Sequence, residues 1–343
     1  MAKKTALGTA GIILLLIFIF REGWTDIVSA WGQVPYFWLI IMLGLQVFTL
    51  LLGAYQWYHL LKNREKSLSL LEVFSINLVG SFVESVTPSV KLGGEGAKIF
   101  LLKQKTGRPY ADLTGVLLVH KFISLVPFLL ILGLVLFAGL LNYSIPGFIY
   151  WSFGSLVVLL LVFSWVIFPK WDQEVSEMSL GFLRKIRGFI LRMLGSVRER
   201  REKISFLQMF AISILIWSLY PVKVFILSRL IGMEIDFLLV SVATFIAYLI
   251  SMLPLSPGGI GTYEGTLAVI LNLNGIPLAE GLGLVLLSRI ITFWIPLVWA
   301  GLATVITMKN YEEKGFLKGG KQNGRKKSEQ ITVLQTADNH PGI

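Results

Sequence analysis

Apolar stretches of about 20 residues recur along almost the whole chain, and they limit its fold more than any other feature of the sequence. Each stretch matches the length of helix that crosses the hydrocarbon core of a bilayer. The stretches are continuous rather than alternating, which argues against a β-barrel. Hydrophobic residues make up 55% of the 343-residue chain and charged residues 15%, whereas soluble domains carry about 25% charged residues. The sequence therefore predicts an all-α polytopic membrane protein.

The polar composition excludes several classes of function. The chain has no cysteine, which rules out disulfides and thiolate metal sites, and its three histidines are far apart. We therefore expect neither a metal site nor a cofactor. The net charge of +11 fits basic cytoplasmic loops and contacts with anionic phospholipids. No basic stretch is interleaved with aromatic residues, so a nucleic-acid partner is not expected.

Basic segments set the expected orientation in the membrane. Residues 62–66, the segment 170–205 and the tail 309–343 are all rich in Lys and Arg. Because such segments stay in the cytoplasm, we expect a multi-pass plasma-membrane protein with cytoplasmic N- and C-termini. The first apolar stretch, residues 5–20, is interpreted as an uncleaved helix, and a signal peptide cleaved after Ala30 is the alternative.

The same features divide the chain into parts. A transmembrane domain is expected over residues 1–308, with two related halves at about 36–141 and 206–307. Between the halves, segment 170–205 carries apolar residues at a helical period, with arginines and lysines between them. This pattern predicts a basic amphipathic helix on the inner membrane surface. The polar, basic tail 309–343 is expected to be disordered.

Two apolar segments, 67–108 and 237–275, are each interrupted in the middle by proline and glycine. The interruptions are Pro88, Gly93 and Gly94 in the first segment and Pro254, Pro257, Gly258, Gly259 and Gly261 in the second. We interpret each segment as a re-entrant helical hairpin, because non-helical backbone inside a membrane needs protein or a water-filled cavity to satisfy it. Two such breaks that meet near the midplane would place helix ends, with their free N–H groups, around an anionic head group.

The two hairpins also have matching neighbours in the sequence. Arg289 lies 168 residues after Lys121, and Glu264 lies 169 residues after Glu95, each glutamate being followed by glycine. The first hairpin is expected to enter from the cytoplasm and the second from outside. This predicts an inverted repeat of span, broken hairpin and span. Chance similarity among leucine-rich segments is the alternative.

Lys121 and Arg289 are each expected near the middle of a membrane span. A cation at that depth costs about 2.5–3.5 kcal/mol or more, so a partner is expected to offset this cost. One interpretation is that both residues bind the phosphate of a lipid, Arg289 with its bidentate guanidinium. The other is that each forms a structural ion pair, with Glu84, Glu95 or Glu264 as its partner.

The carboxylates next to the two breaks are further candidate binding groups. Glu95 and Glu264 could hold an amino head group or transfer a proton, and they could equally cap a helix or pair with a cation. Tyr263 and Lys91, which lie beside the same breaks, are weaker candidates for contact with the cargo. We expect no catalytic residue, because the sequence has no nucleophile or metal motif.

Three segments of the chain resemble a known family. They are TPSVKLGGEGAKIFLLKQKTG (87–107), LPLSPGGIGTYEG (253–265) and LLSRIITFWIPLVWAG (286–301). They resemble the flippase-like family, which is the transmembrane region of the lysylphosphatidylglycerol synthases, or multiple peptide resistance factors. The resemblance covers about residues 5–308. It implies translocation of a lipid between leaflets, and in the resistance factors this lipid is an aminoacyl-phosphatidylglycerol that gives resistance to cationic peptides.

One departure from the family bears on function. The resistance factors carry a soluble C-terminal domain that transfers the amino acid, whereas only about 35 polar residues follow the last span here. We therefore expect a lipid flippase or transporter rather than an aminoacyltransferase. The expected cargo is an anionic or aminoacylated phospholipid, such as lysylphosphatidylglycerol, or a polyprenyl-linked lipid.

Two other functions stay open at this point. One is a membrane-embedded transferase, related to the lysylphosphatidylglycerol synthases, that modifies a lipid head group. The other is a membrane scaffold that recruits a soluble lipid synthase. The expected partners are anionic membrane phospholipids and a separate head-group synthase, and a homo-oligomer is left open.

The expected orientation can be tested by cysteine labelling, because the chain has no cysteine of its own. Asn142→Cys, in a predicted outside loop, should react with a membrane-impermeant maleimide in intact cells. Ser328→Cys, in the basic tail, should react only after the membrane is permeabilised. Labelling of Ser328→Cys in intact cells would contradict the cytoplasmic position of the tail.

Overall fold

The structure, a computed structural model, describes residues 31–32, 34–62, 68–87, 92–167, 206–253 and 256–313. All regular secondary structure in these ranges is helical, which confirms the predicted all-α class. The helices are α3 (Tyr36–Lys62), α4 (Leu70–Val86), α5 (Leu92–Thr106), α6 (Tyr110–Gly139), α7 (Gly147–Ile167), α9 (Phe206–Leu230), α10 (Phe237–Ser251), the 3₁₀ turn η1 (Pro257–Gly259), α11 (Thr262–Asn272), α12 (Leu278–Arg289), the π-helical turn η2 (Ile290–Trp294) and α13 (Ile295–Glu313). The first apolar stretch, the amphipathic segment 170–205 and the tail from residue 314 lie outside the described residues.

Four helical segments are long and apolar enough to cross a membrane: α3, α6, α9 and the continuous segment Leu278–Glu313. Helices α3 and α9 begin at residues 36 and 206, where the two halves were expected to begin, whereas the last segment runs past its expected end at residue 307. The extension is stabilised by packing, because Tyr311 is buried and its hydroxyl donates to the carbonyl of Leu101 in α5. The first residues of the expected tail are therefore helical.

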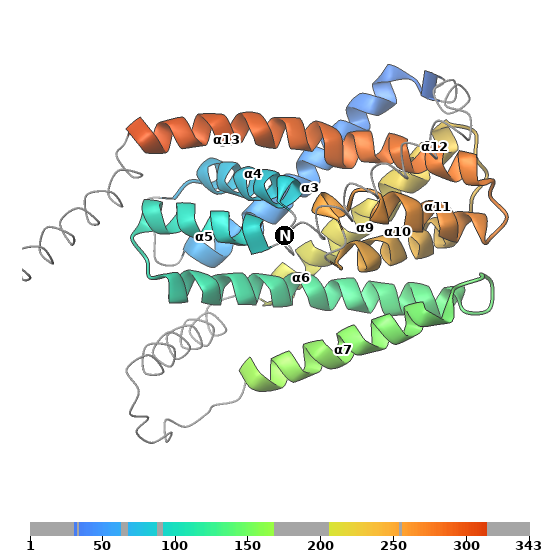
Figure 1. Ribbon diagram of the computed structural model, residues 1–343, viewed down its shortest axis with the longest axis horizontal. Coiled ribbons are helices and arrows are strands. Elements are labelled where there is room, and N and C mark those ends of the chain that lie inside the picture. Colours follow the sequence, from blue (N-terminus) through green and yellow to red (C-terminus); the bar gives the residue numbers. More distant parts are fainter. Residues whose placement is uncertain are drawn as a thin grey trace, which may run out of the picture.

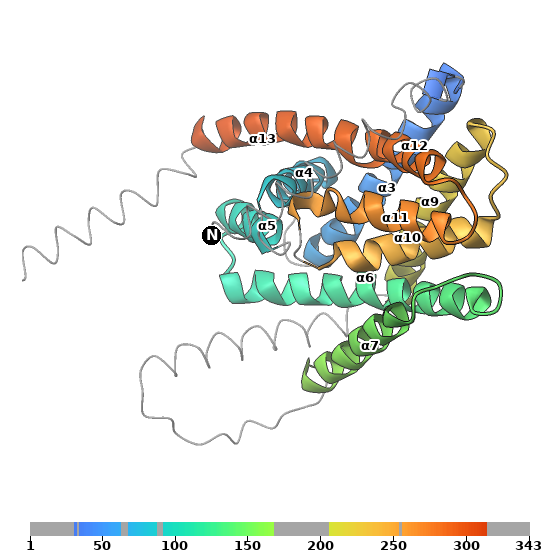
Figure 2. The ribbon, with the colours of Figure 1, turned by 45° about the vertical axis from the view of Figure 1, so that its right-hand side comes forward.

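The two hairpins lie between the long helices. In Figure 1, α6 and the α12–α13 segment run along opposite sides of the molecule. Hairpin α4–α5 occupies one end of the space between them and hairpin α10–α11 the other (Figures 1 and 2). The end of α4 and the start of α11 lie toward the middle of the molecule. This arrangement agrees with two re-entrant segments, and the internal repeat that would relate them stays a prediction.

The open end of the first hairpin is held by local charge pairing. Ser69 Oγ accepts a hydrogen bond from the backbone N–H of Glu72 at 3.2 Å, and Glu72 Oε2 accepts one from the N–H of Ser69 at 2.9 Å. This reciprocal cap begins α4. Glu72 Oε1 also accepts from Lys105 Nζ at 2.6 Å, which joins the start of α4 to the end of α5.

The two helices of this hairpin cross closely at glycines. A Cβ added to Gly94 would overlap the carbonyl oxygen of Gly80 and lie 2.8 Å from Glu84 Cβ. Gly93 and Gly94 were expected in the break itself, but both lie in the first turn of α5. Their lack of a side chain serves helix packing, as small residues do at helix contacts in membranes. Pro88, the other predicted interruption, lies outside the described residues.

The second hairpin turns through left-handed glycines, as its sequence predicts. Gly258, Gly259 and Gly261 have φ of 59°, 71° and 81°. Positive φ is open to glycine at little cost. A Cβ on Gly258 would lie 2.9 Å from Phe293 Cζ and 3.5 Å from Ser85 Cα. The turn of the second hairpin therefore packs directly against the last turn of α4.

Apolar side chains cover the outward faces of the long helices. Leu134 and Phe137 on α6 are 69% and 79% exposed, and Leu302 and Val305 on α13 are 60% and 69% exposed. Exposed apolar surface of this kind is stable only in contact with lipid or another protein. The pattern agrees with a membrane location for the helical bundle.

The connections at the predicted outer end are joined by hydrogen bonds. Tyr143 donates from its hydroxyl to Asp236 Oδ2 at 2.5 Å, and the N–H of Ser144 donates to Asn274 Oδ1 at 2.8 Å. The bond from Tyr143 lowers the pKa of Asp236, while burial and this same bond raise the pKa of Tyr143 to about 12. Both groups therefore keep their hydrogen-bonded forms at neutral pH, with Asp236 charged and Tyr143 neutral.

Gly94→Ala should lower the free energy of unfolding by about 1–3 kcal/mol, because its new methyl group would overlap Gly80. Gly96→Ala in the same helix is the control, since a Cβ there meets nothing within 4 Å. This control should leave stability unchanged or raise it by up to about 1 kcal/mol. Thermal unfolding in detergent micelles measures both variants, and equal unfolding midpoints would contradict the close crossing.

Candidate functional site

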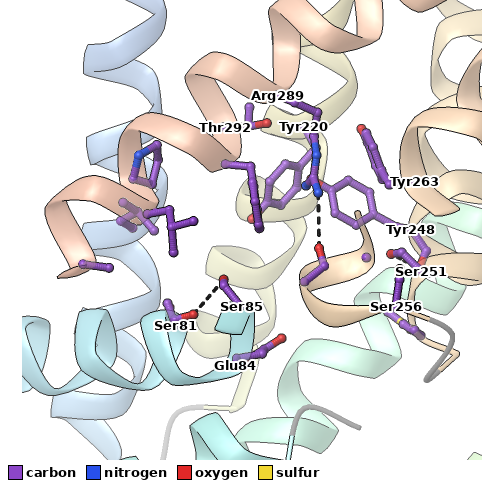
Figure 3. A pocket seen from close by; sticks show the side chains of 18 of the residues that line it. Ser81, Glu84, Ser85, Tyr220, Tyr248, Ser251, Ser256, Tyr263, Arg289 and Thr292 are labelled. Carbon is purple, nitrogen blue, oxygen red and sulfur yellow. Dashed lines mark hydrogen bonds between the residues drawn. The ribbon is translucent and has the colours of Figure 1, made fainter. Parts of the chain in front are cut away.

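A cavity of about 260 Å³ lies between the end of α4 and the turn of the second hairpin. Helix α4 forms one wall, and η1, α10 and α11 form another, while α3, α9 and the segment around η2 complete it (Figure 3). The labelled polar side chains in its lining are Ser81, Glu84, Ser85, Tyr220, Tyr248, Ser251, Ser256, Tyr263, Arg289 and Thr292. The cavity therefore combines polar groups from both hairpins and from two of the long helical segments.

A buried ion pair forms one side of the cavity. Arg289 Nε donates to Glu264 Oε1 at 2.5 Å, and their side chains are only 8% and 3% exposed. Glu264 Oε2 also accepts from the N–H of Gly261 at 2.7 Å, and Arg289 Nη2 donates to the carbonyl of Gly258 at 3.2 Å. The pair thus also binds backbone groups that the glycine turn leaves free.

Aromatic rings pack against the guanidinium of Arg289. Its Cζ lies 4.0 Å from the ring centroid of Phe293 and 5.0 Å from that of Tyr263. Cation–π contacts of this kind hold the plane of the group in place. Of the five guanidinium N–H donors, the described residues accept from two. The other three are available to an anion in the cavity.

A row of tyrosines follows from Arg289 along the cavity wall. The ring centroid of Tyr248 lies 4.9 Å from that of Tyr263 and 4.8 Å from that of Tyr220. Only Tyr263 was a candidate from the sequence. Tyr220 and Tyr248 were missed because single tyrosines in apolar spans are ordinary packing residues. The only signal for them is that polar hydroxyls recur in spans that are otherwise aliphatic.

A second charged cluster lies in the first half of the chain. Lys121 Nζ lies 2.5 Å from Glu95 Oε1, and Lys98 Nζ lies 3.5 Å from Glu95 Oε2. The side chain of Glu95 is 7% exposed, while that of Lys121 is 45% exposed. With two cations and one carboxylate, this cluster has a net positive charge. It is not part of the lining of the central cavity.

The structure therefore separates the predicted site residues into groups. Those that line the central cavity are Glu84, Gly258, Gly259, Tyr263 and Arg289. Each mid-span cation pairs with the glutamate that the repeat aligned beside it, Lys121 with Glu95 and Arg289 with Glu264. Lys91, Pro88 and Pro254 lie outside the described residues. Within the described ranges, no group of three or more His, Asp or Glu side chains could hold a metal ion.

Sequence reasoning missed a third cation inside the membrane, Lys223 of α9. Its residue is 0% exposed, and its Nζ donates to Gln46 Oε1 at 2.6 Å and to Thr49 Oγ1 at 3.3 Å. Its Nζ also lies 4.6 Å from the ring centroid of Tyr220. No carboxylate of the described chain forms an ion pair with it. The signal was present, since Lys223 interrupts a 25-residue apolar helix.

The π-helical turn supplies another polar group. Pro296 has no N–H to donate to the carbonyl of Thr292, four residues earlier in the helix. That carbonyl instead accepts from Gln46 Nε2 at 3.3 Å. Gln46 thus joins α3 to the turn that directly follows Arg289, and both Gln46 and Thr292 line the cavity.

Comparison with known proteins places these features in a family. The family model described as "Lysylphosphatidylglycerol synthase TM region" matches residues 5–300, which include both hairpins and both ion pairs. A UPF0104 membrane protein of Methanothermobacter thermautotrophicus is 22% identical over 315 residues, covering 85% of this chain and 92% of that protein. A UPF0104 membrane protein of Pyrococcus horikoshii is 22% identical over 335 residues, covering 90% and 97%. The similarity thus extends over nearly the full length of these relatives.

Arg289→Gln should lower the free energy of unfolding by about 3–5 kcal/mol, because it leaves the buried carboxylate of Glu264 without its cation. Adding Glu264→Gln should restore part of this loss. Lys105→Gln, which breaks the more exposed pair with Glu72, is the control and should cost about 1 kcal/mol or less. Unfolding in detergent micelles measures all three variants. Equal losses of unfolding free energy for Arg289→Gln and Lys105→Gln would contradict the prediction that the buried pair contributes more to stability than the exposed one.

Proposed function

Since the chain belongs to the family of the lysylphosphatidylglycerol synthase TM region, we propose that it is a flippase of the plasma membrane that moves lipid head groups between leaflets. The observation that carries the proposal is the polar cavity between the end of α4 in the first hairpin and the turn of the second. Discontinuous helices that meet around a polar site are the usual binding element of secondary transporters.

The size of the cavity agrees with a head group as the part that enters. Its volume of about 260 Å³ lies just below the range of about 300–1,000 Å³ for whole small-molecule ligands. Acyl chains would therefore stay in the surrounding bilayer while the head group crosses. The protein then has to replace only the hydrogen bonds that water makes with the polar head group of the lipid.

The charges in the cavity suit a phosphate with a polar substituent. Arg289 offers its remaining N–H donors to the phosphate, and guanidinium is suited to bidentate contacts with phosphate oxygens. Glu84 faces the same cavity from α4 and is placed to accept from an ammonium group (Figure 3). Anionic and aminoacylated phospholipids, such as lysylphosphatidylglycerol, are therefore the proposed cargo. Polyprenyl phosphates share the phosphate, and they belong in the same test.

The cluster of Lys121, Lys98 and Glu95 is the proposed counterpart in the first half. A cation that is 45% exposed inside a span is unfavourable in contact with hydrocarbon alone. A lipid phosphate or water beside Lys121 would remove this cost. We therefore expect the lipid to contact this cluster on its way to or from the central cavity.

A membrane-embedded transferase is less well supported. Such an enzyme needs a carboxylate that is able to exchange a proton with the substrate. Glu264 is bound to Arg289 and to the N–H of Gly261, and Glu95 is bound to Lys121. Both carboxylates therefore already have cationic or backbone donors as partners, which suits a structural or binding role better than acid–base chemistry.

Lipid movement can be measured in proteoliposomes with lipids that carry a fluorescent group on one acyl chain. Dithionite added outside quenches only the outer leaflet, so the slow phase reports translocation. Protein should raise the translocation of phosphatidylglycerol, its lysyl ester or polyprenyl phosphate at least about tenfold above empty liposomes. Rates equal to empty liposomes for all three lipids would end the proposal.

Two variants test the roles of the cavity residues. Arg289→Lys keeps the charge but loses the planar fork, and it should slow every lipid with a phosphate about tenfold. Glu84→Gln should slow the lysyl ester more than phosphatidylglycerol itself. Lys309→Gln, at an exposed position 77% open to solvent, is the control and should leave all rates unchanged.

A further inference from the structure

The arginine that lines the central cavity has its charge cancelled by a buried partner. Arg289 is paired with Glu264, so this ion pair contributes little net charge. By these groups alone, the cavity would not favour a negative head group over a neutral one. A site for anionic lipids therefore needs a further positive charge close by.

Lys223 supplies such a charge directly behind the cavity wall. Its Nζ contacts Gln46 at 2.6 Å and the ring of Tyr220 at 4.6 Å from the centroid, and both of these residues line the cavity. The acceptors around the ammonium are neutral oxygens and an aromatic face. No carboxylate in the described ranges pairs with it, so its charge is not cancelled locally.

The burial of Lys223 increases the distance over which its positive charge acts. The residue is 0% exposed, and its helix α9 packs against α3, α6 and α10. Screening by solvent is weak in such surroundings, and charges act over longer distances than at a surface. An ionisable side chain is costly to keep inside a membrane bundle, and those that are present are therefore most often functional.

Lys223 also fixes which end of the Gln46 amide faces the site. The ammonium binds Gln46 Oε1, so the NH₂ group turns toward Thr292 and donates to its carbonyl. That NH₂ group has a second N–H. The amide oxygen of Gln46 is thus occupied by the ammonium, while its NH₂ group keeps one N–H beyond the bond to Thr292, which also favours an anion.

We infer that Lys223 determines the charge selectivity of the cavity, so that lipids with anionic head groups are taken in preference to zwitterionic ones. This inference rests on the proposed transport function and adds a specificity-determining residue to it. Lys223 acts through the field of its ammonium and through Gln46, and it does not itself touch the head group. Arg289 binds the phosphate that both lipid classes share, and Lys223 recognises the net charge.

The experiment compares two fluorescent lipids in the same proteoliposomes, anionic phosphatidylglycerol and zwitterionic phosphatidylcholine. The unchanged protein should translocate phosphatidylglycerol faster. Lys223→Met should reduce the ratio of the two rates about tenfold, while Lys223→Arg, which keeps the charge, should retain it. The matched control Lys309→Met should also retain it. An unchanged ratio in Lys223→Met would overturn the inference.

A second variant tests the charge without removing the lysine. Gln46→Glu is nearly isosteric and places a carboxylate 2.6 Å from the ammonium, where the amide oxygen now lies. It should reduce the selectivity ratio in the same direction as Lys223→Met. If it left the ratio unchanged, the selectivity would not depend on the uncancelled charge of Lys223.

Lipid binding separates this inference from the transport proposal. The purified protein is exchanged into micelles with equimolar phosphatidylglycerol and phosphatidylcholine, and bound lipid is counted by native mass spectrometry. Phosphatidylglycerol should be enriched on the unchanged protein and on Lys223→Arg, and not on Lys223→Met. If neither lipid moved faster than in empty vesicles, transport would fail, and this binding ratio would still decide the role of Lys223. Equal enrichment on all three proteins would overturn it.

Discussion

The ion pair between Glu264 and Arg289 is the interaction on which the central site depends. A break in a helix at membrane depth leaves N–H and carbonyl groups that hydrocarbon cannot satisfy. In the second hairpin, the N–H of Gly261 donates to Glu264 and the carbonyl of Gly258 accepts from Arg289. The two charges thus satisfy the backbone that the glycines expose, and this backbone completes the hydrogen bonding of the buried charges. Neither feature would be stable in the membrane without the other.

The two pairs of a cation with a glutamate lie in different surroundings. In the second half the pair is enclosed and balanced, with aromatic rings on the guanidinium faces. In the first half Lys121 is 45% exposed, and Lys98 adds a further positive charge next to Glu95. The pair of Arg289 and Glu264 is therefore enclosed by protein, while the pair of Lys121 and Glu95 leaves its cation accessible. A head group that moves between them would pass from an open positive site to an enclosed one.

Much of the helical framework follows from the sequence, because the length of an apolar stretch and the basic loops at its ends depend on local composition. The spans of α3, α6 and α9 were predicted closely for this reason. The partners of Lys121 and Arg289 were left open between three glutamates. Choosing among them requires the packing of α5 on α6 and of α11 on α12, which one sequence does not specify.

Other features depend on relations that local patterns do not contain. Gly93 and Gly94 were placed in the break, but glycine in a helix that packs closely against another has the same sequence signature. Lys223 was overlooked because the partners that satisfy it, Gln46 and Thr49, come from a helix more than 170 residues away. The meeting of Ser85 with Gly258 likewise became visible only in three dimensions.

The π-helical turn at Ile290–Trp294 has a consequence for the whole last span. Each residue advances an α-helix by about 100°, so a turn widened by one residue offsets the faces of the helix on its two sides by about that angle. Arg289 before the turn faces the protein interior, and Val298 and Leu302 after it face outward. Shortening the chain by one residue here would rotate α13 about its axis and exchange its lipid face for another. A gain or loss of a single residue at this point should therefore be far rarer among natural variants than a substitution.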